Sequence, residues 1–562
     1  MADSDFIGKF LGPFGKFQLR STLLIYLVKI PSAWFMACLI FTAKSPPAGE
    51  IFCAPPSNIS NDFSVSQWIK AAHKEKFNRV ENEKSYDFCT IYNDSVSRYL
   101  DHSYSEPNYL MKCTEFEERP SYISIITQYQ LFCSREALVA LTQSFHLLGV
   151  LIGGIIANYM LKSISPRRVM LAGYISQIFL GIATGYSPTY LLHIFFRCAV
   201  AATCSLQCIG IMTLSDITSG KYRVAIVCLF EQFWSIGVIL LPLSGFFSTW
   251  SLVYVSITLP TFILIFLYPL IPDSPRWLIK HGKVDEALKV MLMTARINGK
   301  TDFTKQELES KLQSLATDAL NDPPEPSYWS IWQGNFAHKK ALFVAHIGWS
   351  VYLMLYFASL LHVRAMGRNY LHVNTIIAGL SEIIGTFIGL FLILNTSKKW
   401  IWTSVLNLIA SLVEFSANFV PDTISPFHRM MIYMFTSMTA KTTTSTSLSL
   451  FITCTTELVS KEKKKICNYS GVSCSRTLVM IAPFIGYFVI YGQLVPQNIM
   501  GTMNVVISLL IMTCIDTPRT IPKQQKNQSN LPNELQKSEV ISGDKELTHN
   551  DVIVVEKEST RM

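Results

Sequence analysis

The chain has 562 residues, of which 50% are hydrophobic and 15% are charged, and its formal net charge is +9. Soluble globular proteins carry about 25% charged residues, so this composition argues against a soluble protein and indicates a polytopic membrane protein. The basic residues form short clusters between apolar segments. This pattern is typical of cytoplasmic loops and argues against a nucleic-acid-binding protein.

Twelve apolar segments are long enough to cross a bilayer as helices. The N-terminus before them, residues 1–19, has no pattern of a cleavable signal. Basic clusters follow the second, fourth, eighth and tenth segments, so the positive-inside rule places both termini in the cytoplasm. The predicted segments are 20–42, 138–160, 168–187, 189–214, 224–247, 250–271, 340–361, 372–394, 400–420, 427–453, 468–491 and 496–515.

A long loop, residues 43–137, separates the first two predicted helices and lies outside the cell in this topology. It contains four cysteines, for which an oxidising compartment predicts two disulfides with three open pairings. Two sequons in the loop predict glycosylation at Asn58 and Asn93. The loop either covers the helices as a lid or serves in assembly or substrate entry. Its cysteines are Cys53, Cys89, Cys113 and Cys133.

A second long loop, residues 272–339, contains two amphipathic patterns and divides the helices six and six. We therefore predict an N-terminal half (20–271), a cytoplasmic helical linker, a C-terminal half (340–515) and a disordered cytoplasmic tail (516–562). Two six-helix halves predict a duplicated transporter that moves around a midplane site.

Four stretches carry a family resemblance: "GPFGKFQ" (12–18), "YQLFCSREALVALTQSFHLLGVLIGG" (129–154), "DSPRWLIKHGKVDEAL" (273–288) and "TTELVS" (455–460). With the cysteine-bearing loop, they resemble the organic ion transporters of solute carrier family 22. The resemblance implies the major facilitator fold with 12 transmembrane helices and alternating access in the plasma membrane.

The resemblance also implies charged residues that control the conformational cycle. The loop "NYMLKSISPRR" (158–168) keeps the family's basic pair but lacks its acidic residue and both glycines. This loss leaves a non-transporting receptor or scaffold as an alternative. The gating residues that we expect are Arg167, Arg168, Asp216, Arg223 and Glu457.

Five ionisable residues lie well inside predicted spans: Lys29, Glu231, Glu382, Lys441 and Arg476. A charge at the centre of a helix that faces lipid costs about 2.5–3.5 kcal/mol on insertion scales. Such residues therefore normally face the interior of the bundle and are functional by default.

Arg476 resembles the charged position of helix 11 that sorts substrates in the family. Cation carriers tend to have Asp there, whereas anion and carnitine-type carriers tend to have Arg. A guanidinium binds a carboxylate through two hydrogen bonds. We therefore expect Arg476 to contact substrate; the alternative is a structural pair with Glu382 or Glu231.

The other charges have less specific counterparts. Lys441 matches a lysine of the family's helix 10, or it extends to the interface. Glu382 matches an acidic position of helix 8 and either attracts an ammonium group or pairs with Arg476 or Lys441. Thr386 replaces a lysine of typical anion carriers, which weakens the interpretation that the protein carries only anions. Lys29 has no family counterpart and either neutralises Glu231 or faces the cavity.

Aromatic residues are the remaining candidates for substrate contact, since aromatic faces attract organic cations. The alternative for each of them is packing. They are Trp234 in helix 5 and Trp349, Tyr352 and Tyr356 in helix 7.

We predict a plasma-membrane transporter of zwitterionic or anionic solutes that bear a carboxylate, such as carnitine-like or amino-acid-derived compounds. An organic-cation transporter of the same fold is the alternative besides the receptor. Because no metal cluster, nucleotide loop or nucleophile–base pattern stands out, we expect no enzymatic activity, cofactor or metal. The expected partners are a small organic ion and the bilayer, with a co-transported ion left open and no nucleic acid.

Overall fold

The computed structural model describes residues 6–514, with gaps at 13, 48, 57–63, 79–82, 102–108, 301–302, 322–326, 366–369, 422, 456 and 461–462. The predicted sequon at Asn58 and the predicted tail 516–562 lie outside these residues.

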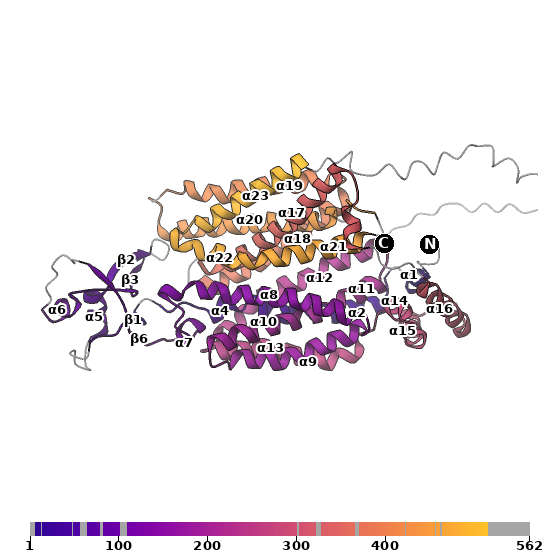
Figure 1. The fold of residues 1–562 in the computed structure, drawn as a ribbon, viewed down its shortest axis with the longest axis horizontal. Coiled ribbons are helices and arrows are strands. Elements are labelled where there is room, and N and C mark those ends of the chain that lie inside the picture. The colour runs from indigo at the N-terminus through magenta and orange to yellow at the C-terminus, as the bar shows by residue number, and fades with distance from the viewer. Residues whose placement is uncertain are drawn as a thin grey trace, which may run out of the picture. The chain divides into compact units, whose positions relative to one another are not determined.

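Eleven described helical segments are long and apolar enough to cross a membrane (Figure 1). They are Lys16–Thr42, Cys133–Met160, Pro166–Gly185, Tyr190–Ile217, Ala225–Phe246, Trp250–Leu270, Phe336–His362, Leu371–Asn395, Lys399–Phe419, Ile466–Tyr491 and Val495–Cys514. Their α-helices are α2 (Lys16–Tyr26), α3 (Lys29–Ala37), α4 (Leu39–Thr42), α8 (Ala137–Met160), α9 (Pro166–Gly185), α10 (Tyr190–Gln207), α11 (Gly210–Ile217), α12 (Gly220–Leu240), α13 (Trp250–Leu267), α17 (Phe336–His362), α18 (Leu371–Asn395), α19 (Lys399–Ser416), α21 (Lys464–Leu478), α22 (Ala482–Tyr487) and α23 (Val495–Cys514).

The tenth predicted span corresponds to α20 (Pro426–Thr455), a helix of 30 residues. It is long enough to cross a bilayer, but its Thr- and Ser-rich middle makes it more polar than the other spans. Helix 1 of the prediction is interrupted between α2 and α3. Pro31 lies in the first turn of α3, and it has no backbone N–H with which to bond the carbonyl of Leu27.

Glycine pairs bring two helix pairs into close contact. A Cβ on Gly149 of α8 would lie 2.0 Å from the Cys198 carbonyl oxygen in α10, and a Cβ on Gly153 would lie 2.3 Å from the Ala202 carbonyl oxygen. In the other half, a Cβ on Gly385 of α18 would lie 2.5 Å from the Thr442 carbonyl oxygen in α20. Small residues four apart are a common device for close approach of membrane helices. The two contacts occupy matching places, the second and fourth predicted helices of each half.

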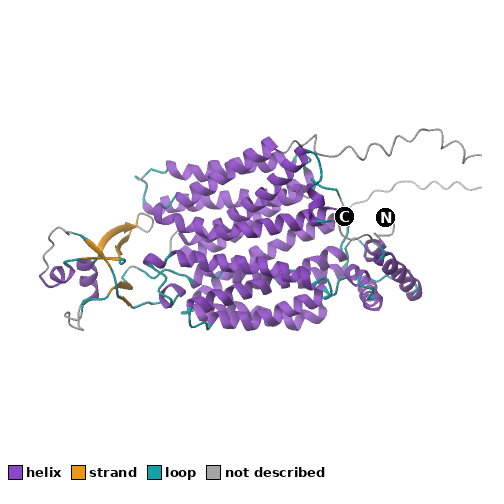
Figure 2. Ribbon diagram, viewed as in Figure 1, coloured by secondary structure: helices purple, strands orange, loops and turns teal. Residues whose placement is uncertain are grey.

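The described part of the loop between α4 and α8 contains all six strands (Figure 2), which the sequence analysis did not predict. The strands are β1 (Ile51–Cys53), β2 (Lys74–Asn78), β3 (Glu83–Asp87), β4 (Thr90–Tyr92), β5 (Leu110–Lys112) and β6 (Phe116–Glu118), and the short helices are α5 (Val65–Ala72), α6 (Ser95–Asp101) and α7 (Ile125–Gln128). The pairs β1–β6, β2–β3 and β4–β5 are antiparallel. Such short two-stranded sheets need other support.

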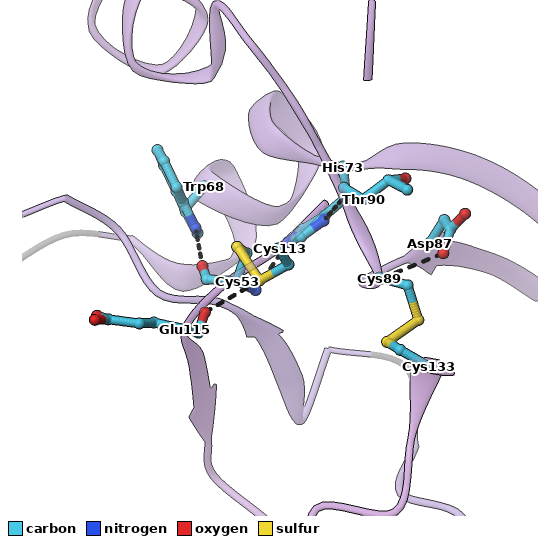
Figure 3. Close-up of a disulfide and its surroundings, with 9 residues drawn as sticks. All are labelled: Cys53, Trp68, His73, Asp87, Cys89, Thr90, Cys113, Glu115 and Cys133. Carbon is cyan, nitrogen blue, oxygen red and sulfur yellow. Dashed lines mark hydrogen bonds between the residues drawn. A yellow bond between two sulfur atoms is a disulfide. The ribbon is translucent and has the colours of Figure 1, made fainter. Parts of the chain in front are cut away.

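Two disulfides support this loop, Cys53–Cys113 and Cys89–Cys133. This arrangement is one of the three pairings that the sequence left open. Figure 3 shows His73 beside the first disulfide, where it accepts a hydrogen bond from the Cys53 amide at 3.1 Å. Trp68 donates its indole N–H to the Cys53 carbonyl. Asn93, the second predicted glycosylation site, is exposed in the turn after β4.

The linker forms α14 (Pro275–Lys280), α15 (Val284–Asn298) and α16 (Lys305–Leu320), one helix more than the two predicted. The linker helices and α1 (Phe6–Leu11) share an apolar cluster with the adjoining ends of the N-terminal helices. Asn298 ties this cluster to the start of α2, because its side-chain oxygen accepts from the Phe17 amide at 3.0 Å.

Candidate functional site

The five charges predicted within the membrane lie on five different helices. Lys29 begins α3 and Arg476 lies in the last turn of α21, whereas Glu231, Glu382 and Lys441 lie near the middle of α12, α18 and α20. The structure brings four of them together as two ion pairs, Lys29 with Glu231 and Lys441 with Glu382. Substrate sites of duplicated transporters lie near the midplane, at the interface of the halves. These helices therefore form the candidate site.

Arg476 contacts the opposite half of the protein. Its Nη1 donates to the Val150 carbonyl oxygen of α8 at 3.0 Å, and a Cβ on Gly154 of α8 would lie 3.0 Å from the same nitrogen. Among the described residues no carboxylate lies within ion-pair distance of the guanidinium. The structural pair with Glu382 or Glu231, which the sequence left as an alternative, is therefore absent from this conformation.

Lys29 and Glu231 form a tight pair within the N-terminal half. The Lys29 Nζ donates to both carboxylate oxygens at 2.8 Å, and it lies 4.4 Å from the centre of the Phe230 ring. The Lys29 side chain is 10% exposed, whereas that of Glu231 is 56% exposed. The sequence alternative in which Lys29 neutralises Glu231 is the observed one.

Glu382 and Lys441 form a looser pair in the C-terminal half. The nearest oxygen, Oε2, lies 3.9 Å from Nζ, and neither atom has a hydrogen-bond partner within the described part of the chain. Tyr356 donates its hydroxyl to the other oxygen, Oε1, at 2.5 Å, and its ring lies 4.6 Å from the Lys441 ammonium. Both charged side chains are almost completely buried, so Lys441 does not extend to the interface.

The predicted aromatic residues occupy different environments. Trp234 packs against an apolar cluster to which both halves contribute, including Met36, Leu147 and Val479. Tyr352 is completely buried within the C-terminal half, and its hydroxyl accepts from Asn407. Trp349 is buried in the same cluster as Tyr352, and the Thr386 hydroxyl donates to the Glu382 carbonyl of its own helix at 3.0 Å.

The predicted gating residues gather at the linker end of the helices. In the N-terminal half, Asp216 accepts from the Ser274 hydroxyl of the linker, Arg168 lies 3.7 Å from Glu286, and the Arg167 guanidinium lies 4.6 Å from the Tyr268 ring centre.

The remaining two gating candidates have partners of different kinds. Arg223 donates to the Ser215 carbonyl at 2.6 Å, and Glu457 pairs with Lys399 at 2.6 Å in the C-terminal half. The loop 158–168 thus keeps a polar contact with the linker through Arg168, although it lacks the acidic residue and the glycines of the family.

Sequence reasoning missed two buried ionisable residues, Arg197 in α10 and Glu414 in α19. Arg197 is completely buried and donates to Gln143 at 2.6 Å and to the Cys38 sulfur at 3.2 Å. Glu414 accepts from Asn504 at 3.1 Å. Both lie inside predicted spans, so the rule that an ionisable residue within a span is a candidate would have found them.

The chain matches known transporters along most of its length. A family model described as "Sugar (and other) transporter" matches residues 85–529. The "Organic cation transporter-like protein" of Drosophila melanogaster is 25% identical over 524 residues, which cover 90% of this chain and 89% of that protein. "Solute carrier family 22 member 7" of Rattus norvegicus is 24% identical, over 71% of this chain and 75% of that protein.

Solved structures show the same fold at low identity. The xylose transporter XylE from E. coli, in a partially occluded inward open conformation, aligns with a TM-score of 0.56 at 13% identity. The alignment covers 89% of this chain and 100% of that one. A second structure of XylE, a major facilitator superfamily proton:xylose symporter bound to 6-bromo-6-deoxy-D-glucose, gives a TM-score of 0.55 at 11% identity, over 88% of this chain and 95% of that one. The fold is that of the major facilitator superfamily.

Proposed function

The chain belongs to the sugar (and other) transporter family, and we propose that it carries small organic ions with a carboxylate group across the plasma membrane by alternating access. The similarity to solute carrier family 22 proteins supports the class of organic ions. In this proposal both termini and the linker are cytoplasmic, and the disulfide-bonded loop is extracellular. The basic clusters of alternate loops and the two disulfides support this orientation.

The state of Arg476 carries the proposal. The other four predicted intramembrane charges have a partner of opposite sign, whereas Arg476 bonds, among the residues that the structure describes, to a backbone carbonyl alone. A guanidinium offers five N–H donors, so most of its capacity is open to a ligand. A carboxylate solute supplies the missing negative charge and two acceptor oxygens.

Substitution of Arg476 tests this role. Charge-assisted hydrogen bonds contribute about 2 kcal/mol each, so Arg476→Ala is expected to raise the KM for a carboxylate solute by roughly 30-fold or more. The measurement is uptake of radiolabelled betaine, choline and benzoate into proteoliposomes. Betaine and choline share a trimethylammonium group and differ in the carboxylate.

The control is Arg296→Ala, which removes an exposed arginine of the linker helix α15 and should leave uptake unchanged. Arg476→Asp should also lose betaine uptake while it gains choline uptake. Unchanged betaine uptake in both Arg476 variants would show that the carboxylate binds elsewhere.

The second candidate function is transport of organic cations. Glu231 favours it, because its side chain is 56% exposed and lies one helical turn from Trp234. The Drosophila relative, named as similar to an organic cation transporter, supports the same candidate. Choline uptake by the unmodified protein, lost in Glu231→Gln and kept in Arg476→Ala, would support this candidate over the first.

A further inference from the structure

The Lys29–Glu231 pair lies close to Arg476 without including it, because Trp234, one turn after Glu231, packs against the same apolar cluster as Val479, three residues after Arg476. Glu231 shares a face of α12 with Trp234 and Ser235, three and four residues further on. That face meets the C-terminal half, since a Cβ on Gly379 of α18 would lie 3.0 Å from the Ser235 carbonyl. Glu231 is also the carboxylate that interacts electrostatically with Arg476.

Two cations thus compete for one carboxylate. Both oxygens of Glu231 are bonded to Lys29 at 2.8 Å, while Arg476 interacts with Glu231 only at longer range. Each charge that leaves water needs a partner to offset its desolvation. If the Lys29 ammonium were absent, Glu231 would keep its negative charge and Arg476 would be a cation with open donors within its electrostatic range.

We propose that Lys29 is a specificity-determining residue that positions the charges of the site, because it occupies Glu231 and so leaves Arg476 open for the carboxylate of the substrate. The inference rests on the proposed function and adds a second determinant of charge selectivity to it. Lys29 does not touch the substrate in this arrangement and acts through Glu231. The solutes that such a site prefers carry a carboxylate and a net charge of zero or below.

The burial of the two partners agrees with this role. The ammonium of Lys29 is buried between Glu231 and the rings of Phe230 and Trp234, at 4.4 and 5.6 Å from their centres. These contacts hold Lys29 in one place. The exposed side of the pair is the carboxylate of Glu231, so loss of Lys29 would release an accessible negative charge.

A double-variant cycle tests the proposal in the full-length protein. Lys29→Met keeps the length of the side chain and removes its charge, and it is expected to raise the KM for betaine at least tenfold at unchanged Vmax per folded molecule. The double variant Lys29→Met/Glu231→Gln removes both charges and should return KM to within about twofold of the original value. Uptake of betaine and benzoate into proteoliposomes gives KM and Vmax, and a thermal unfolding midpoint checks the fold of each variant.

Rescue separates a positioning role from a structural one, since a merely structural pair would not regain a low KM after loss of both partners. An unchanged KM in Lys29→Met, or a double variant that folds and keeps the raised KM, would overturn the proposal. If Arg476→Ala raises KM and Lys29→Met does not, this inference fails alone. If Arg476→Ala leaves KM unchanged, or if the unmodified protein takes up no carboxylate probe, the proposed function fails with it.

Discussion

At the scale of single residues, two ion pairs between distant helices hold four of the five predicted intramembrane charges. The five intramembrane charges could be found because each interrupts an apolar run. Their partners depend on contacts between distant helices, such as α3 with α12, which no local pattern encodes. The sequence therefore left Arg476 with three alternatives, and only the pairing of Glu231 with Lys29 and of Glu382 with Lys441 reduced them.

His73 in the loop is a residue whose protonation should affect local stability. It is buried, accepts from the Cys53 amide through Nε2 and bonds to the Thr90 carbonyl at 2.9 Å through Nδ1. This pattern needs a neutral ring with its proton on Nδ1. Burial lowers the pKa of His73, although the Thr90 carbonyl and Asp87 partly oppose this effect.

Stability of the loop should therefore decrease in acid. A histidine whose pKa is lowered by folding contributes its full stabilisation to the folded state above the unfolded pKa of about 6.5. That contribution is lost as pH falls toward the pKa of the folded state. We expect faster amide exchange in β1 and β4 at pH 5.5 than at pH 7.5, after correction for intrinsic rates, by hydrogen–deuterium exchange. In His73→Gln, which cannot titrate, the difference should shrink. An equal pH dependence in both proteins would contradict the assignment.

At the scale of elements, apolar length predicted the helices well because the bilayer fixes how many residues must span it. It predicted the loop poorly. Strands such as β2 and β5 are only five and three residues long, too short for a clear alternating pattern. Two disulfides and a small apolar cluster around Phe52 and Trp68 support the loop. Breaks such as that between α2 and α3 also remain hidden within an apolar run.

The glycines of α8 provide a test at this scale. A methyl group on Gly153 would lie 2.3 Å from the backbone oxygen of Ala202, and backbone atoms of a packed helix cannot move aside cheaply. Gly153→Ala should therefore destabilise the protein by about 1–3 kcal/mol, the usual cost of overpacking. In contrast, a Cβ on Gly486 of α22 meets nothing within 4 Å. Thermal unfolding in detergent should give a lower midpoint for Gly153→Ala than for Gly486→Ala; similar midpoints would refute the close contact.

At the scale of the whole bundle, the described contacts between the halves concentrate toward the loop-bearing end. The Ser144 hydroxyl of α8 donates to the Met480 carbonyl at 2.7 Å, and one apolar cluster joins Phe41 and Leu241 to Leu360 and Leu371. At the linker end, the apolar clusters of the described residues each belong to one half. The structure therefore corresponds to a state closed on the side that we propose to be extracellular.

Alternating access requires these loop-side contacts to open in every transport cycle. A cross-link between the two halves at this end should therefore block transport. A Cβ on Gly379 of α18 would lie 2.6 Å from the Cγ1 of Ile239 in α12, so the two Cβ atoms are within about 4 Å, the separation that a disulfide spans. Oxidation of the double variant Gly379→Cys/Ile239→Cys should abolish betaine uptake, and reduction should restore it. The single variants, which control for the native cysteines, should keep their uptake under the same oxidant. Uptake by a double variant whose cross-link is complete by mass spectrometry would mean that α12 and α18 stay together through the cycle, and that the halves separate elsewhere.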